Sequence, residues 1–121
     1  MLGWKVFGGG LYGPLVIAMC QDTLTAISAA GTSQGTATEL TTADSEITTA
    51  GAGSGCILSS QLAPGDLQSV FNAGANAVKI YPPTGFQINA LAANAPMLLG
   101  VNTACFYKCV SSTRVYAVLS A

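Results

Sequence analysis

Turn-forming residues divide this chain into runs that are short for helices. From Asp22 onward, Gly, Pro and Asn recur roughly every 8–12 residues, a spacing typical of all-β sandwiches and barrels. The stretches between them are rich in Thr, Val, Ile and aromatic residues, which favour strands. We expect strands in DTLTAISAAG, GTATELTT, SEITTAGAGSG, CILSSQL, LQSVFNAG, NAVKIYPPTG, FQINAL, PMLLGVNTACFYKCV and TRVYAVLSA.

The sequence therefore predicts an all-β protein, a small antiparallel β-sandwich or barrel with an extended N-terminal arm. Residues 22–121 are expected to form the single β domain, and residues 1–21 the arm. GANAV (74–78) and AANAP (92–96) echo each other, and Asn suits tight turns. Because a solenoid needs at least three repeats, we interpret the echo as similar turns at matching ends of a sandwich. GAGSG (51–55) is interpreted as a flexible hairpin tip.

Few residues are charged. Only 7% of the chain is Asp, Glu, Lys or Arg, against roughly 25% in an ordinary domain, while 50% is hydrophobic. Such a surface favours burial against further copies or a partner. The net charge is −1 and the four basic residues are scattered, which excludes nucleic acid as a partner.

One strand, ACFYKCV, is apolar on both of its faces. Side chains alternate along a strand, so one face of this run belongs to the core and the other needs a separate cover. A neighbouring subunit is a natural cover for that second face. The candidate subunit-interface residues are Phe106, Tyr107 and Tyr116.

The residues that usually carry catalysis are scarce. The chain has no His, which is the commonest general base and metal ligand. Asp44 and Glu46 stand two apart, a spacing compatible with a glycosidase pair or a calcium ligand set. Neither lies in an aromatic-rich cleft sequence or a calcium-loop pattern, so we interpret them as a solvated edge. The sequence predicts no catalytic residues, no metal, no cofactor and no enzymatic activity.

Four cysteines are present: Cys20, Cys56, Cys105 and Cys109. Along an extended strand, Cys105 and Cys109 lie about 13 Å apart, too far for a disulfide. An even count also permits two disulfides in an oxidising compartment. We expect four reduced thiols that pack as small apolar groups, in a protein made in the cytoplasm.

The opening stretch, MLGWKVFGGGLYGPLVIAMCQ, fits a signal peptide, a membrane anchor or an ordered arm. Met19 is too large for the position before a lipoprotein cysteine, and the glycines with Pro14 interrupt any helix well short of about 20 residues. We expect no membrane association and an arm that grips another protein or an adjacent subunit. An N-terminal strand packed on its own domain is the alternative. The expected anchors of the arm are Trp4, Phe7, Leu11 and Tyr12.

The part of the chain from residue 31 to 121 resembles small β-rich virion proteins of tailed bacteriophages, head decoration (cement) proteins above all. The motifs that carry the likeness are GTSQGTATELTT, VFNAGANAVKIYPPTG, INALAANAP and the closing aromatic strand. Residues 1–30 lie outside it. The resemblance implies a homotrimer on the outer surface of the virion, with the major capsid protein as its partner. It implies no site residues, because such proteins act through surfaces.

The expected function is therefore that of a capsid decoration protein, synthesised in the host cytoplasm, which stabilises contacts between major capsid protein subunits. A receptor-binding knob or fibre module that recognises host glycan or protein is the alternative. A bacterial surface adhesin is a third possibility, but it requires secretion, for which the sequence contains no credible signal.

Overall fold

The computed structural model describes residues 22–120, so the arm over residues 1–21 lies outside the described residues. The described part of the chain forms ten strands and one three-residue 3-10 helix, η3 (Gln34–Thr36). The strands are β1 (Thr23–Ser28), β2 (Thr38–Glu39), β3 (Asp44–Thr49), β4 (Gly55–Ile57), β5 (Leu67–Asn72), β6 (Val78–Tyr81), β7 (Gln87–Ile88), β8 (Met97–Leu99), β9 (Thr103–Cys109) and β10 (Arg114–Leu119). The all-β prediction is confirmed, and every run expected to hold a strand contains one.

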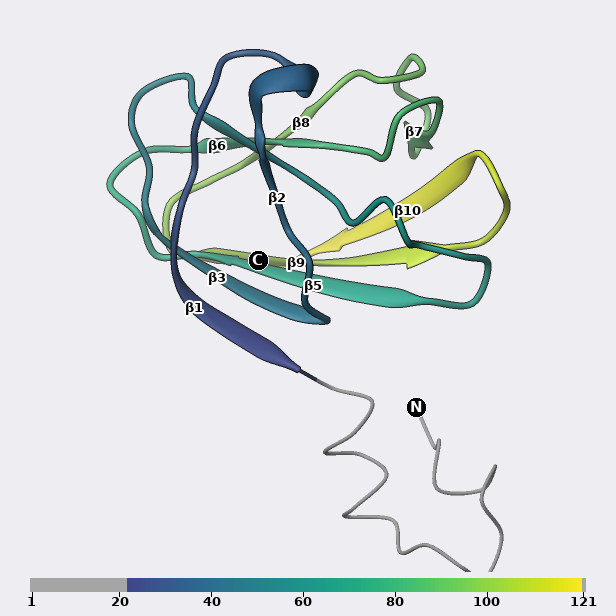
Figure 1. Cartoon of the computed structure of the whole chain (residues 1–121), viewed down its shortest axis with the longest axis horizontal. Helices are drawn as coiled ribbons and strands as arrows, with labels where there is room; N and C mark the ends of the chain where they lie inside the picture. Colours follow the sequence, from purple (N-terminus) through teal and green to yellow (C-terminus); the bar gives the residue numbers. More distant parts are fainter. Residues whose placement is uncertain (1–21, 121) are drawn as a thin grey trace, which may run out of the picture.

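The strands form two sheets (Figure 1). Sheet A has six strands in the order β1-β3-β5-β9-β10-β7, and sheet B has four in the order β2-β4-β6-β8. From β1 to β6 the chain alternates between the sheets, adding one strand to each sheet on every turn. The first half of the domain is therefore a solenoid-like stack of three turns.

The strand pairing differs from the expected antiparallel arrangement. Five of the eight pairings are parallel, and the antiparallel ones are β5 with β9, β9 with β10, and β6 with β8. Parallel neighbours arise because β3 and β5 each follow a crossing through sheet B, by way of β2 and β4. GAGSG is accordingly a corner that joins β3 of sheet A to β4 of sheet B, so its interpretation as a hairpin tip is wrong.

Residues 111–113 form the turn of a hairpin between β9 and β10. β9 and β10 pair in antiparallel register, from Val115 opposite Cys109 to Leu119 opposite Cys105. The turn closes with a hydrogen bond of 3.1 Å from the Val110 N–H to the Arg114 carbonyl. This hairpin extends sheet A beyond the solenoid-like stack.

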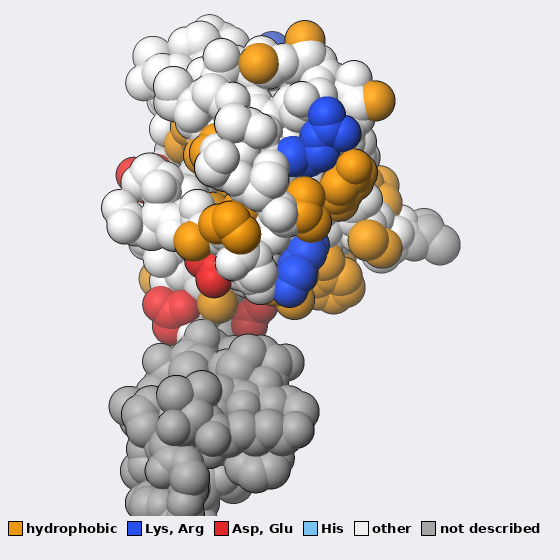
Figure 2. All heavy atoms as spheres, turned by 90° about the vertical axis from the view of Figure 1, so that its right-hand side faces the viewer, with side chains coloured by type: hydrophobic (Ala, Val, Ile, Leu, Met, Phe, Trp, Pro, Cys, Tyr) orange, Lys and Arg blue, Asp and Glu red, His pale blue; other side chains and the backbone are white. Residues whose placement is uncertain are grey.

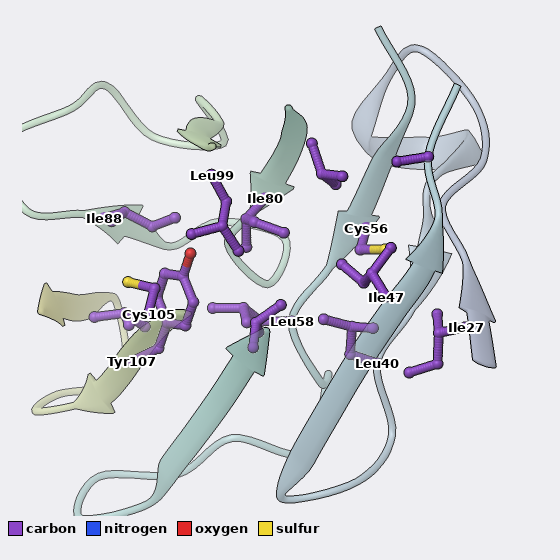
Figure 3. Close-up of a cluster of buried hydrophobic side chains, with 14 of the residues drawn as sticks. Ile27, Leu40, Ile47, Cys56, Leu58, Ile80, Ile88, Leu99, Cys105 and Tyr107 are labelled. Atoms are coloured by element: carbon purple, nitrogen blue, oxygen red, sulfur yellow. The ribbon is translucent and has the colours of Figure 1, made fainter. Parts of the chain in front are cut away.

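The core lies between the two sheets (Figure 3). Sheet A contributes inward side chains such as Ile47, Val70 and Tyr107, and sheet B contributes Ile80 and Leu99; none of these is exposed to solvent. Burying each large apolar side chain is worth about 1.5–3 kcal/mol, so this layer is the main source of stability.

Two buried amides mark the ends of the central strand β5. Gln68 and Asn72 point inward on either side of Val70, and each is only 2% exposed. The Gln68 side chain donates to the Leu40 and Thr42 carbonyls at 2.9 and 3.1 Å and accepts from the Ser59 N–H at 3.0 Å. These bonds satisfy backbone groups of the corners that the strand ladders leave free.

Candidate interaction surface

The outer face of sheet A carries a set of exposed apolar side chains. Residues that alternate with the buried ones on β5, β9 and β10 point outward, because successive side chains in a strand lie on opposite faces. We call this set the apolar strip; its members are Leu67 (54% exposed), Phe71 (half-buried), Phe106 (45%), Tyr116 (46%) and Val118 (63%).

Strand register makes the strip continuous. Ser69 of β5 lies opposite Phe106, which lies opposite Val118 of β10. One step along the same face, Lys108 stands between Leu67 and Tyr116. The members of the strip are therefore neighbours across three paired strands, and they are not scattered over the surface.

Acidic and basic side chains occupy different strands of this face. Asp44 and Glu46 point outward from β3, where they accept hydrogen bonds from the hydroxyls of Thr23 and Thr25 on β1. Lys108 and Arg114 lie on β9 and β10, the strands that carry most of the apolar strip, and Lys108 stands among its members. Figure 2 shows Lys and Arg side chains next to hydrophobic ones, with the acidic side chains gathered apart from them.

Two of the three predicted subunit-interface residues lie on this surface. Phe106 and Tyr116 are both exposed members of the apolar strip, and the Arg114 guanidinium lies 5.8 Å from the centre of the Tyr116 ring. Tyr107 is fully buried in the core of its own chain, so its assignment to a subunit interface is wrong. The arm anchors Trp4, Phe7, Leu11 and Tyr12 lie outside the described residues.

Leu67, Phe71 and Val118 also belong to this surface and were not among the predicted interface residues. Alternation in the closing run TRVYAVLSA places Val118 on the same face as Tyr116, so that residue had a local signal. Leu67 and Phe71 had none, because their position beside Lys108 and Ala104 depends on the pairing of β5 with β9.

Tyr107 carries a polar group that the core does not satisfy. Its hydroxyl is buried and, within residues 22–120, has no hydrogen-bond partner. Burial raises the pKa of this hydroxyl above its ordinary value, and the neighbouring Cys105 thiol adds to the effect. A buried hydroxyl without a partner costs about 1–3 kcal/mol of desolvation.

We therefore expect Tyr107→Phe to raise the free energy of unfolding by about 1 kcal/mol, measured by urea denaturation. Tyr81→Phe is the matched control, because the Tyr81 hydroxyl donates to the Thr32 carbonyl at 3.2 Å and the ring is also buried. That change removes a formed bond and is expected to cost about 1 kcal/mol. A loss of stability in both variants would contradict the assignment of an unsatisfied Tyr107 hydroxyl.

The three described cysteines are free and buried: Cys56, Cys105 and Cys109. Burial raises the pKa of the Cys56 thiol to about 12 and also raises the pKa of Cys105 and of Cys109. The Cys109 thiol donates to the Ser111 carbonyl at 3.2 Å. Since the thiolate is the reactive form, these side chains act as core groups and are poor nucleophiles.

In the native protein at pH 8, iodoacetamide should leave Cys56, Cys105 and Cys109 unmodified, whereas all three should react in denaturant. Peptide mapping by mass spectrometry, on protein kept free of reductant, gives both the modification state and the redox state. Native labelling of any of these three peptides would contradict their burial. A mass lower by the hydrogens lost on forming one or two disulfides would contradict the expectation of reduced thiols.

A groove lined mainly by polar side chains lies next to Asp44 and Lys108 of sheet A. It has a volume of about 790 Å³ and is lined largely by hydroxyl, amide and charged side chains. Among them are Thr41, Ser59, Gln61, Asp66 and Lys108. The Lys108 ammonium already donates to the Gly65 carbonyl at 2.7 Å, and Asp66 accepts from the Ala63 N–H at 3.0 Å.

No group of three or more Cys, Asp or Glu side chains in residues 22–120 is placed to hold a metal ion. The same residues contain no helix of the length and apolar character needed to span a membrane. No family model, curated protein or solved structure matches this chain.

Proposed function

We propose that this chain is a non-enzymatic virion structural protein. It binds the outside of a bacteriophage capsid as an oligomer, most simply a homotrimer, and stabilises contacts between major capsid protein subunits. The observation that carries the proposal is the apolar strip, a multi-strand surface on a domain with very few charges. A surface of this kind favours stable association with protein over free diffusion as a monomer.

The domain suits this role mechanically. We take it to be a sandwich-like body whose first half is a solenoid-like stack, with a core formed by two sheets. Many copies of such a body, each attached through several weak contacts, stabilise a lattice by multivalency. The arm over residues 1–21 would add a second attachment, with Trp4 and Phe7 as its main anchors.

Copy number in purified virions tests this function. Quantitative mass spectrometry against the major capsid protein should find the chain at hundreds of copies per particle. Particles that lack it should lose capsid integrity at a lower temperature than complete particles. A handful of copies confined to one end of the particle would contradict decoration of the capsid.

The arm is tested by the double change Trp4→Ala, Phe7→Ala, with melting temperature and particle occupancy measured on the same protein. If the arm grips the capsid, occupancy falls while the melting temperature is unchanged. If residues 1–21 instead form a strand on their own domain, the melting temperature falls and binding is lost through unfolding.

The polar groove favours a second candidate function, a receptor-binding module of a phage fibre that recognises a host surface glycan. Hydroxyl, amide and carboxylate groups such as those of Thr41, Gln61 and Asp66 are suited to hydrogen-bonding a sugar. The groove has no aromatic side chain on which a sugar ring would stack. A low copy number together with binding of the isolated protein to host cells would favour this function.

A further inference from the structure

We infer that the outer face of sheet A is a self-association surface, occupied by a second copy of this chain. In this contact the acidic side of one copy, Asp44 and Glu46, lies against the basic side of the next, Lys108 and Arg114. The inference deepens the proposed function, because it assigns a surface and a polarity to the self-association on which that function rests.

The size of the face supports an interface between proteins. Five strands from β1 to β10 span about 24 Å, and six residues of strand span about 20 Å, giving a nearly flat area of roughly 500 Å² before side-chain relief. The apolar strip covers part of this area, and exposed apolar patches of a few hundred Å² are often interaction sites. A stable interface buries about 800 Å² from each partner, so we expect association that depends on concentration in the micromolar range.

The charges on this face are separated by the sheet itself. Two strand spacings separate β3 from β9 and three separate it from β10, about 10–14 Å. This separation exceeds the Debye length of about 8 Å at physiological salt, so the two sets hardly interact within one copy. Within residues 22–120, Lys108 and Arg114 donate instead to the Gly65 carbonyl and the Tyr116 hydroxyl.

An arrangement with acids on one side and bases on the other complements itself. When copies meet head to tail around an axis, the β3 side of each copy reaches the β9 and β10 side of its neighbour. The same contact, from the β3 side of one copy to the β9 and β10 side of the next, is made by every neighbouring pair in a closed ring, including a trimer with sheet A facing the axis. The apolar strip, which shares β9 and β10 with the basic side chains, then lies within the contact, where it is shielded from water.

Partners of other chemistry fit the face less well. A uniformly charged surface would attract one side of the strip and repel the other. A copy of this chain carries both signs at the required spacing, together with an apolar centre. Residues 1–21 precede β1 in the sequence, but their one charge, Lys5, offers no acidic partner for Lys108 and Arg114.

Charge reversal on the full-length chain tests the inference, with light scattering and sedimentation over a range of concentrations. The wild type is expected to self-associate. Asp44→Lys with Glu46→Lys makes the face wholly basic, and Lys108→Glu with Arg114→Glu makes it wholly acidic. Each double change should weaken self-association by about 30-fold or more, because attraction becomes repulsion at two pairs.

A variant with all four changes exchanges the acidic side chains of β3 with the basic side chains of β9 and β10, and its net charge equals that of the wild type. The head-to-tail complementarity returns, so the quadruple variant should self-associate within about threefold of the wild type. If the doubles weaken association and a folded quadruple fails to restore it, the proposed pairing is wrong. Circular dichroism confirms folding, and the milder Asp44→Asn and Lys108→Gln changes replace any double that does not fold.

Val118→Ser tests the apolar strip, with Leu98→Ser on β8 as its control. Both side chains are 63% exposed, but Leu98 lies on sheet B. Val118→Ser should weaken association about tenfold, and Leu98→Ser less than twofold. A wild type that stays monomeric at 100 μM, or an oligomer indifferent to Val118→Ser and to the reversals, overturns the inference. Neither result changes the virion copy number, which tests the proposed function separately.

Discussion

Replacing Gly31 with alanine is expected to lower the free energy of unfolding by about 3 kcal/mol, or the melting temperature by roughly 15 °C. Gly31 has φ = +74°, a left-handed conformation that strains other residues. A Cβ there would also overlap the carbonyl oxygen and the hydroxyl of Thr36. Thr36 belongs to η3, whose first turn closes onto Ser33, so neither group is free to move away.

Gly53→Ala separates the two causes of that loss. Gly53 has nearly the same backbone angle, φ = +77°, but a Cβ there would meet nothing within 4 Å. We expect this control to lose only about 1 kcal/mol, the cost of the left-handed conformation itself. Urea denaturation of both variants measures the difference. Equal losses would show that the contact between Gly31 and Thr36 relaxes without cost.

Local patterns in the sequence predict the strands but not their partners. Thr-rich and Val-rich runs bounded by Gly, Pro and Asn identify each strand, because those signals act within a few residues. Whether the next strand joins the same sheet depends on contacts distant in the chain. The runs GAGSG at 51–55 and SST at 111–113 are both short turn segments between two strands, yet the first changes sheets and the second does not.

The same limit applies to the candidate surface. Apolar residues occupy both faces of residues 104–110, so alternation alone does not tell which face meets the core. The structure buries Tyr107 and exposes Phe106 because Val70 and Ser69 of β5, opposite Cys105 and Phe106, fix which face turns inward. The separation of Asp44 from Lys108 is likewise a property of strand order. The sequence shows only that charged residues are few, and it does not show how they are separated on the folded surface.

Asn72 belongs to the junction between the two halves of the domain, and the sequence does not single it out. Its side-chain NH₂ donates to the Leu99 and Asn76 carbonyls at 3.0 Å and to the Gly100 carbonyl at 3.2 Å. Its side-chain oxygen accepts from the Gly74 N–H at 2.9 Å. One amide thus ties the corner after β5 to the turn between β8 and β9.

We expect Asn72→Ala to lower the free energy of unfolding by about 4 kcal/mol, because it removes all four of these hydrogen bonds and leaves the Gly74 N–H without its partner at a site that is only 2% exposed. Asn76→Ala is the control, since that exposed side chain makes one bond, to the Ala50 carbonyl at 2.8 Å, and its loss should cost about 1 kcal/mol. Both values come from urea denaturation. Similar losses in the two variants would mean that water reaches the groups Asn72 leaves behind, and that the junction is held by the strand ladders alone.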